Sequence, residues 1–227
     1  MCGRFGLSYP PSRLIDWYRA RVMPEYEYRY NTPPTADIVA IRDDEEGRTG
    51  SLMRWGLIPW WAKDGKKAPL LHNARSETIN IKPIFKTSFY RRRCIIPASG
   101  FFEWKRLPDG RRQPFYISSR DGNPLSFAGI WDTARVDGLR VDSCAIITTD
   151  CNALMQPIHD RMPVILGEDD WNTWLTPDEL SDEVLLPMLK PFEPDRMQLW
   201  AVSPSVGNVM NQGEELIRPV LLSDSIK

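Results

Sequence analysis

The sequence predicts an α+β fold whose core is a mostly antiparallel curved sheet or open barrel, with helices at the periphery. Apolar, strand-like runs cluster between residues 94 and 166, whereas helical patterns stand apart from them; this separation is typical of α+β domains. Turn sequences divide the runs and favour antiparallel hairpins: Pro-Asp-Gly at 108–110, and Asp-Gly at 121–122 and 137–138.

The first part of the chain predicts one helix and a hairpin of two strands. The helix covers residues 12–22, where Ser12 can cap the N-terminus and apolar residues recur with helical spacing. Residues 38–42 and 52–58 are predicted strands, and the charged segment 43–47 joins them as a turn.

Residues 59–69 predict an exposed loop. The adjacent Trp60 and Trp61 cannot both point inward from a regular strand, so at least one is expected at the surface. Lys63, Lys66 and Lys67 lie in the same loop. Aromatic side chains that stack on bases, interleaved with lysines that neutralise phosphates, suit single-stranded nucleic acid.

The rest of the chain alternates strands with short helical segments. A helix is predicted at 84–93, where Arg91, Arg92 and Arg93 would suit its C-terminus. The acidic stretch 168–189 predicts two surface helices, and residues 206–220 close the core. Further strands are expected at 94–105, 115–118, 125–136, 140–149 and 198–203.

Bulk composition limits the class of protein. The 227 residues carry a net charge of −1, with 42% hydrophobic and 26% charged residues, as in ordinary globular domains. No apolar run of about 18 residues predicts a membrane span, and no signal peptide is evident. Four cysteines without paired spacing suit a reducing, cytoplasmic setting. We expect one monomeric domain over residues 2–220 and a frayed tail over 221–227.

The N-terminus offers unusual chemistry. Cysteine is small enough for routine removal of Met1, after which Cys2 would carry a free α-amine and a thiol on adjacent carbons. The amine titrates at about pH 8 and the thiol at about pH 8.5, so both are partly nucleophilic at neutral pH. An aldehyde would form an imine with the amine, and the thiol would then close a five-membered thiazolidine ring, an intramolecular step.

Few other residues are candidates for proton transfer. Glu103 lies between Phe102 and Trp104, and a carboxyl group among aromatic residues should have a raised pKa. Imidazole chemistry must use His72 or His159, because the sequence has two histidines. No Cys-x-x-Cys or His-x₃₋₅-His spacing predicts a metal site, and no cofactor is expected.

Seven sequence blocks resemble one family. They are Met1-Cys-Gly-Arg-Phe5; Arg29-Tyr-Asn31 with Pro34; Trp55-Gly56 with Pro59 and Trp61; Asn73-Ala-Arg75 with Glu77-Thr78; Gly100-Phe-Phe-Glu-Trp104; Ile158-His-Asp-Arg161 with Pro163; and Val206-Gly-Asn208 with Asn211 and Gly213. In this order they resemble the SRAP (SOS response-associated peptidase) family over nearly the whole chain. The departure from its pattern is His72, where an apolar residue is common.

The resemblance implies a sensor of abasic sites in single-stranded DNA. Cys2 would form a stable thiazolidine crosslink with the C1′ aldehyde of the ring-opened sugar. Asn73 would orient the sugar and the Cys2 amine, Glu103 would shuttle protons, and His159 would act as a second acid or base.

The resemblance also implies how DNA is held. Three arginines would clamp phosphates, although they could instead pair with carboxylates such as Asp160 and Glu77. Trp104 and Pro34 would stack on or wedge apart neighbouring bases. The arginines are Arg4, Arg75 and Arg161.

Two other functions are compatible with the same sequence. Class II glutamine amidotransferases also begin Met-Cys-Gly, and their N-terminal thiol attacks an amide. Arg4 stands where they usually have an aliphatic residue, and no Asn-Gly oxyanion segment is clear. A non-covalent single-strand binder that uses the tryptophan loop is a third reading. Abasic-site lyase activity and self-cleavage before Cys2 are further expectations for the SRAP reading.

Overall fold

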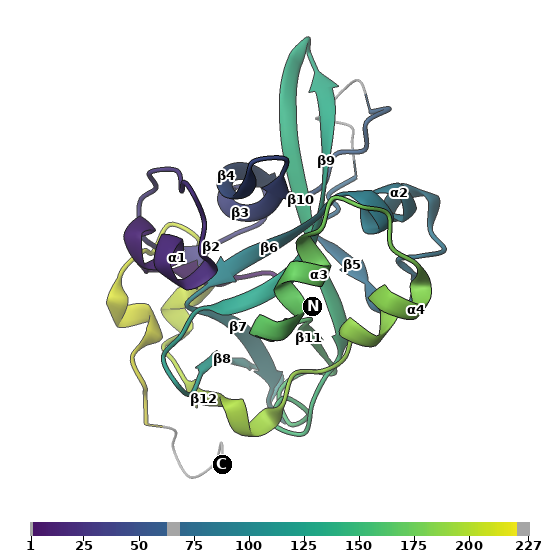
Figure 1. Ribbon diagram of the computed structural model, residues 1–227. Helices are drawn as coiled ribbons and strands as arrows, with labels where there is room; N and C mark the ends of the chain where they lie inside the picture. The colour runs from purple at the N-terminus through teal and green to yellow at the C-terminus, as the bar shows by residue number, and fades with distance from the viewer. Residues whose placement is uncertain (1, 63–68, 222–227) are drawn as a thin grey trace.

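Two β-sheets form the centre of the computed structural model, which describes residues 2–62 and 69–221 (Figure 1). One sheet has the strand order β12-β8-β7-β1-β2. The other follows the order β11-β10-β4-β3-β6-β9, and β9 also pairs with β10, so that β10, β4, β3, β6 and β9 close into a barrel. Pairing is antiparallel except where β4 and β5 lie parallel to β10. The predicted α+β class with a barrel-like core is confirmed.

Two of the predicted turns join antiparallel neighbours, β7 with β8 at 108–110 and β9 with β10 at 137–138, whereas the Asp121-Gly122 turn leads from β8 in the first sheet to β9 in the second. Segments 38–42 and 52–58 correspond to β3 and β4, although β4 begins and ends earlier than predicted. The strands of the first sheet are β1 (Phe5–Leu7), β2 (Arg29–Thr32), β7 (Gly100–Arg106), β8 (Arg112–Ser119) and β12 (Met197–Ala201). Those of the second are β3 (Asp37–Asp44), β4 (Gly47–Trp55), β5 (Asn73–Arg75), β6 (Arg93–Ala98), β9 (Leu125–Val136), β10 (Leu139–Asp150) and β11 (Arg161–Pro163).

The single strand predicted at 94–105 is in fact two strands in different sheets. β6 ends at Ala98, and β7 begins at Gly100. A Cβ atom on Gly100 would lie 2.4 Å from the ring of Tyr116 and 2.5 Å from the carbonyl oxygen of Ile117. Only glycine therefore allows the chain to cross from one sheet to the other at this point.

Helices surround the two sheets and are shorter than the sequence predicts. They are α1 (Pro11–Tyr18), α2 (Pro83–Arg91), α3 (Trp171–Leu175) and α4 (Asp182–Leu185), and short 3-10 turns occur between Glu168 and Ile217. Ser12 is not the N-cap of α1, because Pro10 takes that position and Pro11 begins the helix. Arg19 adopts a left-handed conformation (φ 53°), which ends α1 before residue 22. No helix in the described parts of the chain could cross a membrane.

Arg93 does not extend the C-terminus of α2, as the sequence suggested. It begins β6 and is 3% exposed. Its guanidinium donates hydrogen bonds to five carbonyl groups, those of Phe89, Tyr90, Trp174, Thr176 and Asp178. Burial lowers the pKa of Arg93 to about 10. This side chain joins the end of α2 to the segment around α3, a long-range contact that helix patterns do not reveal.

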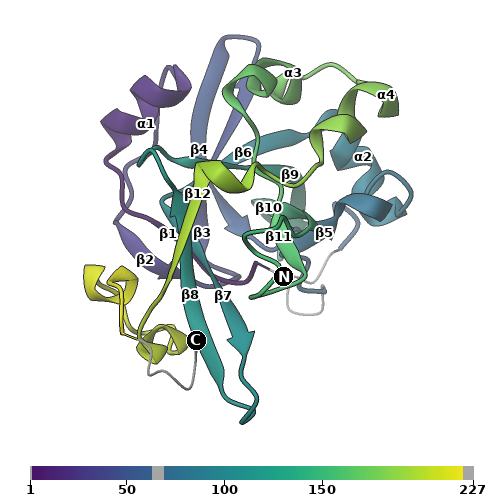
Figure 2. The same ribbon diagram turned by 90° about the horizontal axis from the view of Figure 1, so that it is seen from below.

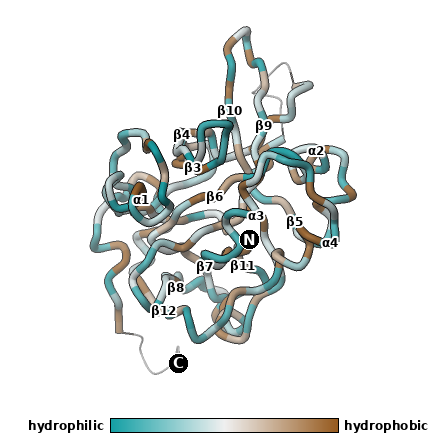
Figure 3. Tube along the Cα trace, viewed as in Figure 1, coloured by the Kyte–Doolittle hydropathy of each residue, from teal (hydrophilic) through white to brown (hydrophobic). Residues whose placement is uncertain are grey.

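The apolar core has two main parts, one where α1, α2 and α3 pack on the second sheet and one where the second sheet meets the first. Phe5 packs edge-to-face on Trp55 (5.0 Å between ring centroids) and on Phe127 (6.0 Å). Cys94 and Cys144 are fully buried, as expected for small core residues. In Figure 3 the turn between β3 and β4 is coloured as hydrophilic, in contrast to the hydrophobic stretches of the core strands. Because Phe5 is part of this core, the segment that carries Cys2 is anchored three residues away.

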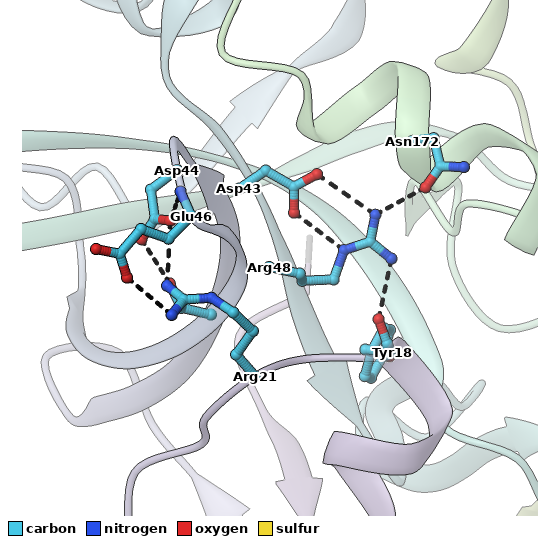
Figure 4. Close-up of polar contacts among 8 residues, drawn as sticks. Tyr18, Arg21, Asp43, Asp44, Glu46, Arg48 and Asn172 are labelled. Carbon is cyan, nitrogen blue, oxygen red and sulfur yellow. Dashed lines mark hydrogen bonds and ion pairs between the residues drawn. The ribbon is translucent and has the colours of Figure 1, made fainter.

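Arg48 connects three peripheral elements (Figure 4). Its Nε atom pairs with Asp43 Oδ1 at 3.0 Å, and its two terminal nitrogens donate to the Tyr18 carbonyl at 3.0 Å and to Asn172 Oδ1 at 2.9 Å. The end of α1, the β3–β4 hairpin and α3 are thereby tied together. The neighbouring pair of Arg21 and Glu46 is exposed, so we expect it to contribute little to stability.

Candidate functional site

The N-terminal segment is held beside the strand that carries Glu103. β1 pairs with β2 on one side and with β7 on the other. The backbone N–H of Phe102 donates to the Arg4 carbonyl at 3.0 Å, so the pairing continues past β1 toward Cys2. The Cys2 side chain is 0% exposed. The nucleophile predicted from sequence therefore lies in a protected position next to β7.

Asn73 holds the backbone of Cys2. Its Nδ2 atom donates to the Cys2 carbonyl at 2.8 Å. Asn73 begins β5, which runs parallel to β10 with Asn73 opposite Ile146. The Asn73 Oδ1 atom is buried and has no hydrogen-bond partner among the described residues. A buried carbonyl oxygen of this kind can accept a hydrogen bond from an amine or a sugar hydroxyl beside Cys2.

Glu103 and His159 form the acid–base part of the site. Glu103 is 3% exposed, and its Oε2 atom lies 3.9 Å from His159 Nε2. Burial raises the pKa of Glu103 to about 7, so it can both donate and accept a proton near neutral pH. Burial also lowers the pKa of His159, so the neutral ring prevails at pH 7.

The backbone fixes the tautomer of His159. The N–H of Arg161 donates to His159 Nδ1 at 3.0 Å, so the neutral ring carries its proton on Nε2, toward Glu103. Asp160 Oδ1 lies 2.9 Å from the same Nδ1 atom and can pair with it only when the ring is protonated. His159 can therefore donate a proton from Nε2, and the neighbouring carboxyl group of Glu103 can accept it.

The thiol of Cys2 is neutral in this environment. Burial raises its pKa well above the ordinary value, and the negative charge of Glu103 raises it further. A thiol that is not ionised needs a base when it attacks, and Glu103 is a carboxyl group whose charge acts on it. Proton transfer from Cys2 to Glu103 is thus the step that this arrangement can support.

The matching family model is described as SOS response associated peptidase (SRAP) and covers residues 1–209. The chain belongs to the SRAP family. An abasic site processing protein of Bacillus subtilis, YoqW, is 40% identical over 223 residues, which cover 96% of this chain and 99% of that protein. YedK of Escherichia coli is 32% identical, covering 97% of this chain and 100% of that protein.

A vertebrate relative and a solved structure are also similar to this chain over most of its length. The rat protein HMCES, also named as an abasic site processing protein, is 30% identical over 96% of this chain and 76% of its own length. A crystal structure of a Bacteroides thetaiotaomicron protein has a TM-score of 0.86 at 26% identity, covering 97% of this chain and all of that one. SRAP membership and fold therefore rest on sequence and structure together.

Arg161 of this SRAP chain has an environment unlike that of a free phosphate ligand. Its guanidinium contacts Glu77 Oε1 at 2.6 Å, Asp150 Oδ1 at 2.8 Å and the Thr148 carbonyl at 2.8 Å. Burial alone would lower its pKa, but the carboxylates of Glu77 and Asp150 outweigh burial and raise it. The structure thus favours the carboxylate pairing that the sequence left open, and a phosphate contact would have to compete with it. Arg161 also holds β11, and hence His159, against β10.

The other predicted arginines differ from Arg161. Arg4 donates to Asn31 Oδ1 at 2.8 Å and to the Val206 carbonyl at 3.2 Å, so part of its guanidinium is already bound. It nevertheless lines a cleft of about 410 Å³ together with Trp104. Arg75 is exposed at the end of β5, with no side-chain hydrogen bond or ion pair to another described residue. Of the three, Arg75 is the most accessible to a phosphate.

The predicted stacking residues differ in exposure. Trp60 and Trp61 are 69% and 54% exposed, so both lie at the surface. Their loop is anchored where the Ile58 N–H donates to Ser143 Oγ at 2.8 Å. Trp104 and Pro34 are half-buried. Lys63, Lys66 and Lys67, predicted in the same loop, lie outside the described residues.

Sequence reasoning missed several residues around the site. Arg112 lines the cleft with Arg4 and Trp104. The Pro-Asp-Gly turn could have revealed this, because it places Arg112 opposite Arg106 in the hairpin register. Asn31, which is fully buried and accepts a hydrogen bond from Arg4, stands in one of the seven sequence blocks, but its role was not predicted. Within residues 2–62 and 69–221, no cluster of three His, Cys, Asp or Glu side chains could hold a metal ion.

Proposed function

We propose that this SRAP protein is a sensor of abasic sites in single-stranded DNA, and that Cys2 traps the C1′ aldehyde as a thiazolidine crosslink that protects the site. The carrying observation is that Cys2, Asn73, Glu103 and His159, separated by up to 157 positions in the sequence, meet in one cluster in which Cys2 and Glu103 are buried. Relatives in bacteria and vertebrates are named abasic site processing proteins, which supports the same substrate class.

The first step joins the α-amine to the aldehyde. Once Met1 is removed, the Cys2 nitrogen attacks C1′ and forms a carbinolamine. Glu103 in its acid form donates a proton to the departing oxygen, water leaves, and an imine remains. Asn73 restrains the Cys2 backbone through its 2.8 Å bond, which fixes where the amine lies.

The second step closes the ring. The Cys2 sulfur attacks the imine carbon, its thiol proton passes to Glu103, and the nitrogen takes up a proton. One water is lost overall, and no net proton is consumed. His159, with its Nε2–H toward Glu103, supplies or accepts protons between the two steps.

Two finer activities belong to the same proposal. If the ring fails to close, the imine can undergo β-elimination, which would cut the DNA strand as an abasic-site lyase does. The family's peptidase description would correspond to removal of the residue before Cys2, Met1, which exposes the Cys2 amine.

DNA would be held by contacts around the reactive cluster. Arg75 and Arg4 would bind flanking phosphates, with Arg161 as a further phosphate ligand if its carboxylate partners yield. The stacking residues would support the neighbouring bases. We expect the protein to act as a monomer, which light scattering after gel filtration will test. The proposed stacking residues are Pro34, Trp60, Trp61 and Trp104.

The decisive experiment mixes purified protein with a single-stranded oligonucleotide that contains one abasic site. A denaturant-resistant shift on a gel is expected with the abasic strand and none with an undamaged strand. Intact-mass analysis should show protein lacking Met1 plus the oligonucleotide, less one water. Ammonia release from glutamine without any adduct would instead favour the amidotransferase reading, and binding without a covalent product would favour a simple single-strand binder.

A further inference from the structure

A basic hairpin projects from the first sheet beside the reactive cluster. The ends of β7 and β8 and the turn between them, residues 105–112, carry four basic residues and one acidic residue. We call this segment the basic arm. Figure 2 shows it extending away from the body of the molecule. Its basic residues are Lys105, Arg106, Arg111 and Arg112.

The charge of the basic arm opposes its own folding. Arg106 lies directly opposite Arg112 in the antiparallel register, and both side chains are exposed. Like charges at opposed positions of a hairpin are unfavourable. Asp109 at the turn pairs with Arg111 at 2.6 Å, so it offsets only that arginine. By contrast, the turn between β3 and β4, with Asp44 and Glu45, is acidic. The net positive charge of the basic arm is therefore not shared by the β3–β4 turn.

A cleft connects the basic arm to the reactive residue. Arg112 shares the cleft of about 410 Å³ with Trp104, Arg4 and Gly3, the residue next to Cys2. A strand whose abasic sugar lies at Cys2 can therefore pass from the cleft onto the basic arm, with a base on Trp104 and a phosphate on Arg112.

We propose that the basic arm is a second DNA-binding element, which holds nucleotides on one side of the abasic site and makes the footprint of the protein asymmetric. The six residue steps from Glu103, in the reactive cluster, to Asp109, at the tip of the basic arm, span about 20 Å at about 3.3 Å per residue. That length matches at most about six stacked nucleotides at about 3.4 Å each. The inference rests on the proposed reaction with abasic single strands.

The test compares crosslinking rates on three oligonucleotides under conditions where binding limits the rate. One has ten nucleotides on each side of the abasic site, and the others keep two on the 5′ or the 3′ side. The parent protein should crosslink more slowly to only one of the two shortened strands than to the long strand. The variant Arg106→Gln/Arg112→Gln should react with the long strand as slowly as the parent reacts with that shortened strand, and should lose nothing further on shortening.

Two controls make the result specific. Arg135→Gln/Arg140→Gln removes two arginines from the β9–β10 hairpin and should leave the parent pattern unchanged. On undamaged strands, loss of two phosphate contacts should lower the salt slope by about 1.4, which is about a seven-fold smaller loss of affinity between 50 and 200 mM salt. Circular dichroism should show that both variants remain folded.

The outcomes separate this inference from the proposed function. The DNA-binding role of the basic arm would be refuted by either of two results. One is equal slowing of the parent on both shortened strands; the other is a basic-arm variant that matches the parent on every strand and in salt slope. If the parent forms no adduct at all, the proposed reaction fails, and the salt slopes on undamaged strands still decide whether the basic arm binds DNA.

Discussion

Glu103 allows the sharpest test of the proposed chemistry. With a pKa of about 7, its base form rises from about one tenth at pH 6 to about nine tenths at pH 8. Glu103→Gln keeps the size of the side chain but cannot accept the Cys2 proton. At pH 7.5 we expect ring closure to slow by about 10²-fold, the scale of one acid–base group, with DNA affinity nearly unchanged.

The ratio of parent to variant rates isolates Glu103 from the Cys2 amine. The amine titrates in both proteins, so its pH dependence cancels in the ratio. If Glu103 acts as the base in ring closure, the ratio should rise about ten-fold between pH 6 and pH 8. The assay is rapid quench of the abasic strand followed by a denaturing gel, before the reaction saturates. A ratio that stays flat across this range would remove Glu103 as the base.

Stability measurements exclude unfolding as the cause. Because the pKa of Glu103 is raised above the ordinary 4.5, the folded state holds the proton more tightly than the unfolded state. The parent should therefore lose stability as pH rises from about 4.5 to about 7, by on the order of 1–3 kcal/mol. Glu103→Gln lacks this loss, so urea unfolding at pH 8 should find it at least as stable as the parent.

Three further predictions concern DNA contacts and the N-terminus. Arg75→Ala should lower the salt slope of single-strand binding by about 0.7, with a free energy of unfolding within about 0.5 kcal/mol of the parent. Arg161→Ala should lower the free energy of unfolding in urea by about 2–3 kcal/mol, because Glu77 and Asp150 lose their partner. A salt slope that is unchanged in either variant counts against the phosphate role of that arginine. Trp60→Ala and Trp61→Ala should each weaken single-strand binding by about 1–3 kcal/mol in fluorescence titrations and leave stability unchanged, and equal affinity would exclude stacking. Cys2→Ser should give an imine that borohydride traps but no stable adduct, and a residue that cannot be removed before Cys2 should abolish both; a heat-stable adduct from the blocked protein would assign the chemistry to another side chain.

Local signals predicted much of the fold. The Pro-Asp-Gly turn at 108–110 and the Asp-Gly turn at 137–138 determine their hairpins through a few adjacent residues, so β8, β9 and β10 lie where the sequence predicted them. Helix lengths were overestimated because Arg19 ends α1 in a left-handed conformation that apolar spacing does not reveal. The burial of Arg93 was missed because its five carbonyl partners come from segments up to 85 residues away.

The candidate site was predictable in its members but not in its arrangement. Cys2 and Glu103 could be selected from chemistry alone, because an N-terminal thiol and a carboxyl among aromatics have distinctive reactivity. The 3.9 Å approach of His159 to Glu103 depends on β11 joining β10 while β7 lies in the other sheet, which no local pattern encodes. The pairing of Arg161 with Glu77 has the same origin, since it links β11 to the turn after β5.

The position of β1 between two partner strands has a mechanical consequence. DNA attached to Cys2 would be tethered three residues from the beginning of β1, which is bonded to β2 on one side and to β7 on the other. Tension on the strand, for example from a moving helicase, would load these hydrogen bonds together along the strand axis instead of opening them one at a time. We therefore expect the N-terminal segment to resist extraction under load, so that release of the tethered DNA by force would require β1 to slide out of the sheet as a unit.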